Sequence, residues 1–432
     1  MNDPFLPKWL IWITIALPMS SIATLCQELI AGADMSLLAF FESKRVVYKD
    51  NGQPDDALLI IKRRGINCVR LRIFTSSPEQ AAADPYNYIN NLDYTLPLAK
   101  RVKSAGLKLI LDFHYSDTWA DPQHQAIPTA WTNLSFQQLC QMVRSYTSNV
   151  IYTLHIAEAT PDYVQIGNEI TAGMLWPEGK VGGTNDTPLQ WQKLTKLIIN
   201  GIQGARDVPL ANPPKIIIHI DRGGDWLGAK WFFDNLTRYQ VQFDIIGYSY
   251  YPWWHGPFSN LTVCISNSAN AYKKPIMIVE TAFPWTHSTN IYGIPATTNG
   301  QLEYVVKLAT TVHSIPRQPV IGIIWWGAEY QHLPGYALAG FQYKSFWYTD
   351  GNVLPVVQAL GQLAKPAVIS VMKHTQNQIL LWWPLSSVGI IPPLTTSLVN
   401  CSWIPLINNA PQTDGLTFSY AYPVEHIQPT NF

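Results

Sequence analysis

VQIGNEI, residues 164–170, carries the pattern that decides the fold. An apolar run rich in β-branched residues ends abruptly in an amide, Asn168, and a carboxylic acid, Glu169. Burying either group without a partner costs free energy. The run therefore either ends at a capped surface turn or delivers both groups to a site that uses them. The rest of the chain distinguishes these two interpretations.

Seven further runs have the same form, short and almost continuously hydrophobic. Such runs are typical of parallel strands that are covered on both faces. With the first run they predict eight strands, over residues 29–36, 66–74, 107–115, 163–170, 215–221, 243–251, 275–283 and 320–327.

Amphipathic stretches separate these strands and predict helices. Gly65 and Gly106 end two of them as C-caps, and Ser135 begins a long one as an N-cap. The helices are predicted over residues 55–65, 95–106, 135–159, 188–205, 225–239 and 300–315. Eight strands alternating with helices predict an α/β protein, a (β/α)8 TIM barrel, over residues 26–365.

Both ends of the chain differ from this pattern. Residues 1–25 contain Lys8 and the apolar run WLIWITIALPM, which predict a signal peptide and a secreted or cell-surface protein. The run is too short to span a membrane, and Leu25 before Cys26 disfavours a lipid anchor. Residues 366–432 read as short alternating segments and predict a small all-β module. A structural role for this module is favoured over a sorting, spacer or sugar-binding role.

The composition excludes several classes of function. Lys and Arg number 29, as do Asp and Glu, so the chain has no electrostatic reason to bind nucleic acid or an anionic membrane. Five cysteines form no CxxC pair, which leaves a metal cluster unsupported and any disulfide pairing open. The 17 Trp and 21 Tyr either fill the core or form platforms for sugar rings.

Polar residues gather where the predicted strands end, and in a TIM barrel this is the catalytic face. They are Asp34, Arg70, Arg72, Asp112, His114, Tyr115, Asp117, Asn168, Glu169, Tyr250, Tyr251, Glu280, Trp325 and Trp326. Any one of them alone fits a surface or packing role, but so many at one level of the barrel indicate a site.

Glu169 and Glu280 end the fourth and seventh strands and form a candidate catalytic pair. Hydrolysis of a glycosidic bond with retention needs two carboxyl groups roughly 5–5.5 Å apart. One must hold a proton while the other stays charged. Arg72 is predicted to keep Glu280 ionised, and Asn168 to bind the sugar 2-hydroxyl.

Longer motifs add a resemblance to a known family. They are DFHYSDTWADPQHQAIPTAW (112–131), VQIGNEITAGMLWPEG (164–179), GYSYYPWWHG (247–256) and IVETAFPWT (278–286), with GADMS (32–36) and VRLRIF (69–74). In this order they resemble the family 53 glycoside hydrolases, the endo-β-1,4-galactanases of clan A. The resemblance implies a retaining double displacement with Glu169 as general acid/base and Glu280 as nucleophile.

The resemblance also implies a set of substrate-binding residues. Asn168 and Trp326 would line the subsite of the sugar to be cleaved, and Tyr250, favoured over Tyr251, would touch the nucleophile. The implied substrate-binding residues are Asp34, Arg72, His114, Asp117, Trp119, Asn168, Tyr250, Tyr251, Trp254 and Trp326, with Trp176 and Trp253 as further platforms or groove walls and His255 as a further polar contact.

The expected activity is hydrolysis of internal β-1,4-galactosyl bonds in pectic galactan and type I arabinogalactan, by a monomer without a membrane span. No cofactor is expected, because residues 286–301, after the seventh strand, lack the acidic side chains of the calcium loop of some relatives. Two alternatives stay open at this point: an endo-glycosidase for another β-1,4-glycan, and a glycan-binding barrel without catalysis.

Overall fold

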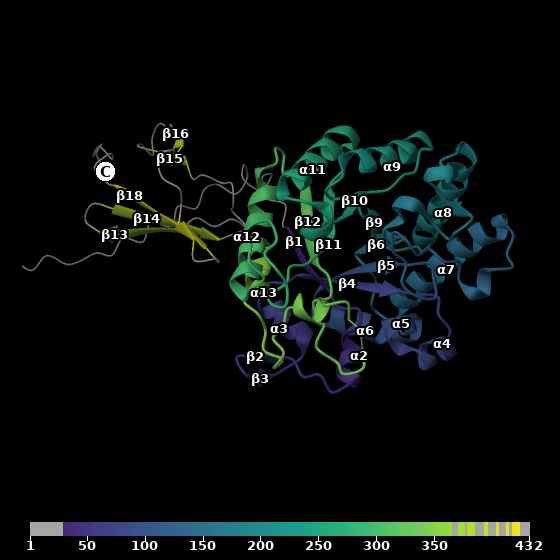
Figure 1. Cartoon of the computed structure of the whole chain (residues 1–432), viewed down its shortest axis with the longest axis horizontal. Helices are drawn as coiled ribbons and strands as arrows, with labels where there is room; N and C mark the ends of the chain where they lie inside the picture. The colour runs from purple at the N-terminus through teal and green to yellow at the C-terminus, as the bar shows by residue number, and fades with distance from the viewer. Residues whose placement is uncertain are drawn as a thin grey trace, which may run out of the picture.

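The computed structural model describes residues 29–336 and 338–364, and beyond them a set of strands between residues 370 and 423. All eight predicted strands form one closed parallel barrel, so the predicted TIM barrel is confirmed (Figure 1). Around the barrel the strand order is β1-β12-β11-β10-β9-β6-β5-β4. The bounds are β1 Ile30–Asp34, β4 Cys68–Ile73, β5 Lys108–Phe113, β6 Tyr163–Ile166, β9 Lys215–Ile220, β10 Ile245–Ser249, β11 Ile276–Thr281 and β12 Val320–Trp325.

Helices surround the barrel and bury its outer face (Figure 1). The longer ones are α3 Ala57–Arg63, α6 Leu92–Ser104, α7 Phe136–Ile156, α8 Pro188–Asp207, α9 Trp226–Arg238, α11 Phe258–Tyr272, α12 Thr298–Ser314 and α13 Val356–Gln362. Short elements in the loops are α2 Leu38–Ser43, α4 Pro78–Ala83, α5 Pro85–Tyr88, α10 Pro252–His255, β2 Lys49–Asp50, β3 Gln53–Pro54, β7 Gly173–Met174 and β8 Gly179–Lys180. Single 3-10 turns are η1 Thr129–Trp131, η2 Ile170–Ala172, η3 Gly183–Asn185 and η4 Phe341–Tyr343.

The helix ends predicted from Ser135 and Gly65 lie where these two residues place them, whereas the helices predicted to begin at residues 95 and 300 begin at Leu92 and Thr298. Ser135 caps α7 through a full capping box with Gln138, which satisfies backbone N–H groups that the first helical turn leaves free. Gly65 follows α3 with a φ of 96°, a left-handed conformation that glycine adopts without strain.

The barrel interior is apolar at its base and polar toward the carboxyl ends of the strands. The apolar layer consists of Ile30, Cys68, Ile110, Ile217, Ile245, Met277, Val279 and Ile324. Side chains alternate along a strand, so inward positions recur two and four residues further on: Arg70, Asp112 and His219 follow after two residues, and Asp34 and Ser249 after four. These buried polar groups form the floor of the catalytic face.

The two ends of the chain are described in part or not at all. The predicted signal peptide, Cys26 and Cys401 lie outside the described residues. Cys68, Cys140 and Cys264 are buried free thiols. Within the described part of the chain, no helix is both long enough and apolar enough to cross a bilayer.

The described elements after residue 364 are all strands. An antiparallel sheet has the order β13-β14-β18-β17, and β15 pairs with β16. Their bounds are β13 Ser370–Thr375, β14 Gln378–Pro384, β15 Pro393–Thr395, β16 Trp403–Pro405, β17 Gln412–Thr413 and β18 Thr417–Pro423. A separate module over residues 366–432 stays a prediction.

Candidate active site

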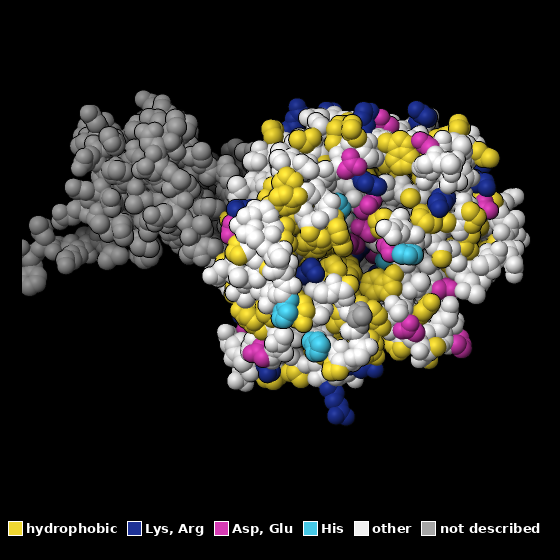
Figure 2. Space-filling model, viewed as in Figure 1, with side chains coloured by type: hydrophobic (Ala, Val, Ile, Leu, Met, Phe, Trp, Pro, Cys, Tyr) yellow, Lys and Arg dark blue, Asp and Glu magenta, His cyan; other side chains and the backbone are white. Residues whose placement is uncertain are grey.

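A cavity of about 290 Å³ opens at the carboxyl ends of the barrel strands. Figure 2 shows a hollow in this face with acidic side chains inside it and hydrophobic side chains around its edge. Its lining is Arg72, Tyr86, His114, Trp119, Ala120, Asp121, Asn168, Glu169, Tyr251, Trp254, Glu280, Trp326, Leu338, Ala339 and Phe341. The cavity thus brings together both predicted catalytic carboxyls and most of the predicted binding residues.

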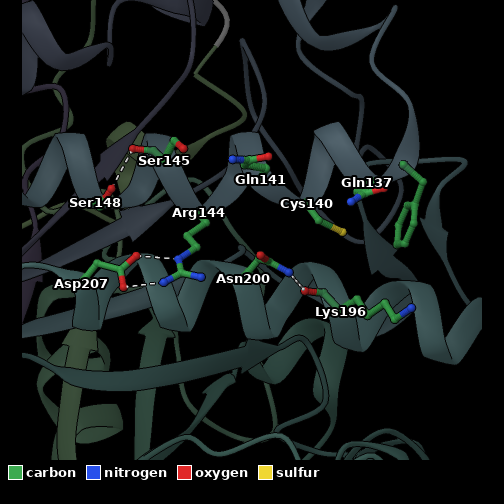
Figure 3. A pocket seen from close by; sticks show the side chains of 10 residues that line it. Gln137, Cys140, Gln141, Arg144, Ser145, Ser148, Lys196, Asn200 and Asp207 are labelled. Carbon is green, nitrogen blue, oxygen red and sulfur yellow. Dashed lines mark hydrogen bonds and ion pairs between the residues drawn. The ribbon is translucent and has the colours of Figure 1, made fainter.

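A second, larger hollow lies on the outside of the barrel, between α7 and α8 (Figure 3). It has a volume of about 620 Å³ and is lined mainly by amides, hydroxyls and basic groups. Its one carboxylate, Asp207, already pairs with Arg144, 2.6 Å from that guanidinium. A reaction that needs two carboxyl groups therefore cannot take place in this outer hollow. The cavity at the barrel mouth is the candidate active site.

A backbone irregularity directs Glu280 into the cavity. Met277 and Val279 both point into the barrel, so regular alternation would turn Glu280 outward toward the helices. Between Ile278 and Thr281, however, β11 carries one residue more than its neighbour β12, and its register with β10 shifts at the same place. This β-bulge re-aims the carboxyl, as bulges beside active sites commonly do.

Arg70 holds the floor of the site together. Its guanidinium lies 2.8 Å from Asp34, 2.8 Å from Asp112 and 3.0 Å from the Glu280 carboxylate. It also donates to the Asn168 side-chain oxygen at 2.9 Å. The Arg70 side chain is only 1% exposed, so several buried acids share one buried cation.

The prediction that Arg72 pairs with Glu280 is wrong, because Arg70 occupies that position. Arg70 and Arg72 are successive inward residues of β4, two positions apart. Arg70 lies at the height of the Glu280 carboxylate. Arg72 lies one step higher, 3.4 Å from Asp34, with its guanidinium 4.1 Å from the Trp119 ring centre. Arg72 still lines the cavity.

The preference for Tyr250 as the neighbour of the nucleophile is also wrong. Tyr251 donates its hydroxyl hydrogen to Glu280 at 2.9 Å, whereas Tyr250 donates to the backbone oxygen of Gly256. The inward positions of β10 are Ile245 and Ser249, and Tyr251 continues that alternation. Tyr250 points outward into the core.

Two further predicted contacts lie beneath or beside the cavity and do not line it. Asp34 is fully buried, between the two arginines and Ser36. Asp117 accepts hydrogen bonds from Thr75, Gln80 and Thr129 and so holds loops together. Neither carboxylate is placed to touch a ligand in the cavity.

Glu169 has a left-handed backbone with φ 47° and ψ 48°, an uncommon conformation for a residue with a side chain. The turn begins at Gly167, whose φ is 79°. Positive φ at a non-glycine residue is costly and clusters at functional sites. Here it ends β6 and swings the carboxyl over the barrel mouth.

A hydrogen-bond relay positions the Glu169 carboxyl. Ser249 donates to Glu169 Oε1 at 2.6 Å, and His219 Nε2 lies 2.8 Å from the Ser249 oxygen. Since Ser249 gives its hydrogen to Glu169, we assign the His219 hydrogen to Nε2. Nδ1 then accepts from the Gln165 amide at 3.1 Å.

The two carboxyls have different electrostatic surroundings. Burial raises the pKa of Glu169 well above its usual range, and the nearby charges of Glu280 and Asp221 raise it further. Burial also raises the pKa of Glu280, to about 7, but Arg70 and the Tyr251 hydroxyl oppose that rise. Of the pair, Glu169 is the better proton holder and Glu280 the better anion.

His114 and Asn168 are held rigidly at the cavity wall. His114 Nδ1 accepts from the Ala120 backbone at 2.8 Å, so Nε2 carries the hydrogen and lies 2.9 Å from Asp112. Burial lowers the pKa of His114, which keeps the ring neutral. Asn168 donates an amide hydrogen to the Ala120 oxygen at 2.8 Å.

Sequence reasoning missed several residues of the site. Gln165, His219 and Ser249 form the relay, and Asp121 and Phe341 line the cavity. Strand alternation would have found the first three, since each is an inward position near a strand end. Asp121 and Phe341 lie on loops, which follow no such period. In the described part of the chain, no three His, Cys, Asp or Glu side chains are arranged to hold a metal ion.

Comparison with known proteins gives one consistent family. Residues 30–360 match the family model described as Glycosyl hydrolase family 53. An uncharacterized protein of Niallia circulans is 41% identical over 315 residues, 69% of this chain and 83% of its own. The arabinogalactan endo-beta-1,4-galactanase A of Aspergillus niger is 34% identical over 325 residues, 72% of this chain and 87% of its own. The solved GH53 catalytic domain of Ignisphaera aggregans has a TM-score of 0.71 and 31% identity, and the match covers 80% of this chain and 98% of that one.

Proposed function

Because the chain belongs to glycosyl hydrolase family 53, and is thus a glycosidase, we propose that it is a retaining endo-β-1,4-galactanase. Its substrates would be pectic galactan and type I arabinogalactan. The observation that carries the proposal is the pair Glu169 and Glu280 on the wall of one cavity, with unlike electrostatic surroundings. The choice of galactan rests on the activity named for the Aspergillus niger relative.

In the first step, the Glu280 carboxylate attacks the anomeric carbon of the sugar in the cavity. Glu169 gives its proton to the departing glycosidic oxygen, so the leaving chain departs as a neutral alcohol. The product on the protein is a glycosyl ester of Glu280. Esterification removes the Glu280 charge, and Arg70 remains paired with Asp34 and Asp112.

In the second step, Glu169 is ionised and takes a proton from water as that water attacks the same carbon. The ester bond breaks, Glu280 regains its charge beside Arg70, and the sugar leaves with its original configuration. We expect the second amide hydrogen of Asn168 to bind the sugar 2-hydroxyl. Trp119, Trp254 and Trp326 provide faces for sugar rings, and Trp254 is 66% exposed at the mouth.

The test is release of reducing ends from unbranched galactan by the purified protein. Glu280→Gln and Glu169→Gln should each lower kcat by a factor of about 10³ or more, since each removes one of two essential groups. Glu303→Gln, on the outer helix α12, is a matched control and should keep full activity. Equal activity of Glu280→Gln and the unaltered protein would refute the role of Glu280.

A panel of β-mannan, β-glucan and galactan decides between galactan and another β-1,4-glycan. Binding of galactan with no cleavage over a long incubation would favour a glycan-binding barrel instead. We also propose that the protein acts outside the cytoplasm, based on the apolar run within residues 1–25. Sequencing the amino terminus of protein recovered from culture medium tests this directly.

A further inference from the structure

Lys344 is a basic residue at the edge of the catalytic face with an unusual environment. It follows the turn η4, in the long loop after β12. Its ammonium lies 4.6 Å from the ring centre of Phe341 and 5.4 Å from that of Trp253. Its printed hydrogen bond goes to a neutral acceptor, the backbone oxygen of Gly340, at 3.1 Å. The ammonium therefore lies in an aromatic corner.

Among the residues that the structure describes, no carboxylate pairs with this ammonium. Burial alone lowers the pKa of Lys344, to about 8, with no acidic neighbour to oppose it. A partly buried cation without an anion is costly, and proteins seldom keep one without a use.

The aromatic corner adjoins the catalytic cavity. Phe341 lines the cavity, and so do Tyr251 and Trp254, which pack against Trp253 with ring centres 5.2 and 5.5 Å away. Tyr251 in turn is bonded to Glu280. The ammonium is thus two side chains from the nucleophile, on the wall formed by the loops after β10 and β12.

We propose that Lys344 binds a carboxylate carried by a sugar of the substrate, so that the site accepts glycan chains containing uronate residues beside the neutral sugar it cleaves. Aromatic rings next to a lysine suit this ligand, because the rings hold the apolar face of the sugar while the ammonium meets its acidic group. The inference rests on the proposed function for the neutral part of the chain.

A purely structural role makes a different prediction. If Lys344 only bridges two loops through cation–π contacts, its loss weakens the binding of acidic and neutral chains alike. If it binds a carboxylate, the loss falls mainly on the acidic chain and fades with added salt.

The experiment measures binding by calorimetry in the Glu280→Gln background, where no substrate is consumed. The probes are a β-1,4-linked galactotetraose and the same oligosaccharide with one primary hydroxyl oxidised to a carboxylate. Lys344→Met should lower the ratio of acidic to neutral association constants about tenfold, the value of one charge-assisted hydrogen bond. Lys344→Arg keeps the charge and should restore most of that ratio.

Lys274 supplies a matched control. Its ammonium lies 4.5 Å from the Phe243 ring centre and donates to the Phe243 backbone oxygen, but it precedes β11 at the opposite end of the barrel. Lys274→Met should leave the ratio unchanged. An acidic oligosaccharide that binds no more tightly than the neutral one overturns the inference, as does an equal loss for both in Lys344→Met. Cleavage of galactan by the unaltered protein is scored separately, so failure of the galactanase proposal is distinguished from failure at Lys344.

Discussion

The substitution Tyr251→Phe removes one hydroxyl and tests whether that hydroxyl lowers the pKa of Glu280. That hydroxyl donates to the Glu280 carboxylate at 2.9 Å and helps to hold the pKa of Glu280 down near 7. A hydrogen bond to a charged group contributes about 1.5–3 kcal/mol, and one pKa unit corresponds to about 1.36 kcal/mol. Loss of the hydroxyl should therefore raise the pKa of Glu280 by about one to two units.

The sign follows from the role of the residue. In the proposed mechanism Glu280 must be ionised to attack, so activity rises with pH through its pKa, and a higher pKa moves this acid limb to higher pH. The assay is kcat/KM on galactan across the pH range, which reports ionisations of the free enzyme. On the acid side, Tyr251→Phe should be about ten- to hundredfold slower at a given pH, with part of the loss recovered as pH rises.

Tyr250→Phe is the matched control, since its hydroxyl bonds to the Gly256 backbone and not to Glu280. It should leave the acid limb where it is, with any cost appearing as lower thermal stability. A shifted limb in Tyr250→Phe together with an unshifted limb in Tyr251→Phe would refute the reasoning. The two titrations belong to the coupled pair of carboxyls, so the measured limbs are compared between variants rather than assigned singly.

Ser249→Ala removes the hydrogen-bond donor that lowers the pKa of Glu169. The alkaline limb of the kcat/KM profile should therefore move to higher pH, and kcat should fall. An alkaline limb at the same pH in both proteins would contradict the relay. Gly167→Ala places a Cβ 2.6 Å from a neighbouring methyl carbon at a φ of 79°, and should cost about 1–3 kcal/mol of unfolding free energy in a denaturant titration. Gly52→Ala shares the positive φ but meets nothing within 4 Å, so it should cost less, and equal losses would show that backbone strain alone matters. Arg70→Met leaves buried carboxylates without their cation and should destabilise the protein by about 3–5 kcal/mol, measured as a lower urea midpoint with an unchanged slope.

The barrel could be predicted because its signal is local and repeated. Each strand is a hydrophobic run and several helices carry a cap or a terminal glycine, so eight weak strand signals support one architecture. The candidate catalytic pair could be predicted for the same reason, since Glu169 and Glu280 lie at strand ends. Strand ends of a parallel barrel meet at one face.

Partner choice within the site was harder to predict. Arg70 and Arg72 are both inward residues of β4, and only the height of the carboxylates in the assembled barrel decides which one meets Glu280. Tyr251 continues the alternation of β10, but it lies beyond Ser249, where the strand ends and its period no longer fixes the direction of a side chain. Loop residues such as Phe341 depend on tertiary packing that no sequence period encodes.

The extra residue in β11 has a consequence for protein engineering. The direction of the Glu280 carboxyl depends there on how many residues the strand contains, not on which side chains surround it. Deleting Val279 would leave the other groups that line the cavity chemically intact, but Glu280 would take the inward place of Val279 in the apolar layer, below the mouth. A barrel shortened by that one residue is therefore a route to a lectin-like reagent, which recognises its polysaccharide without cutting it.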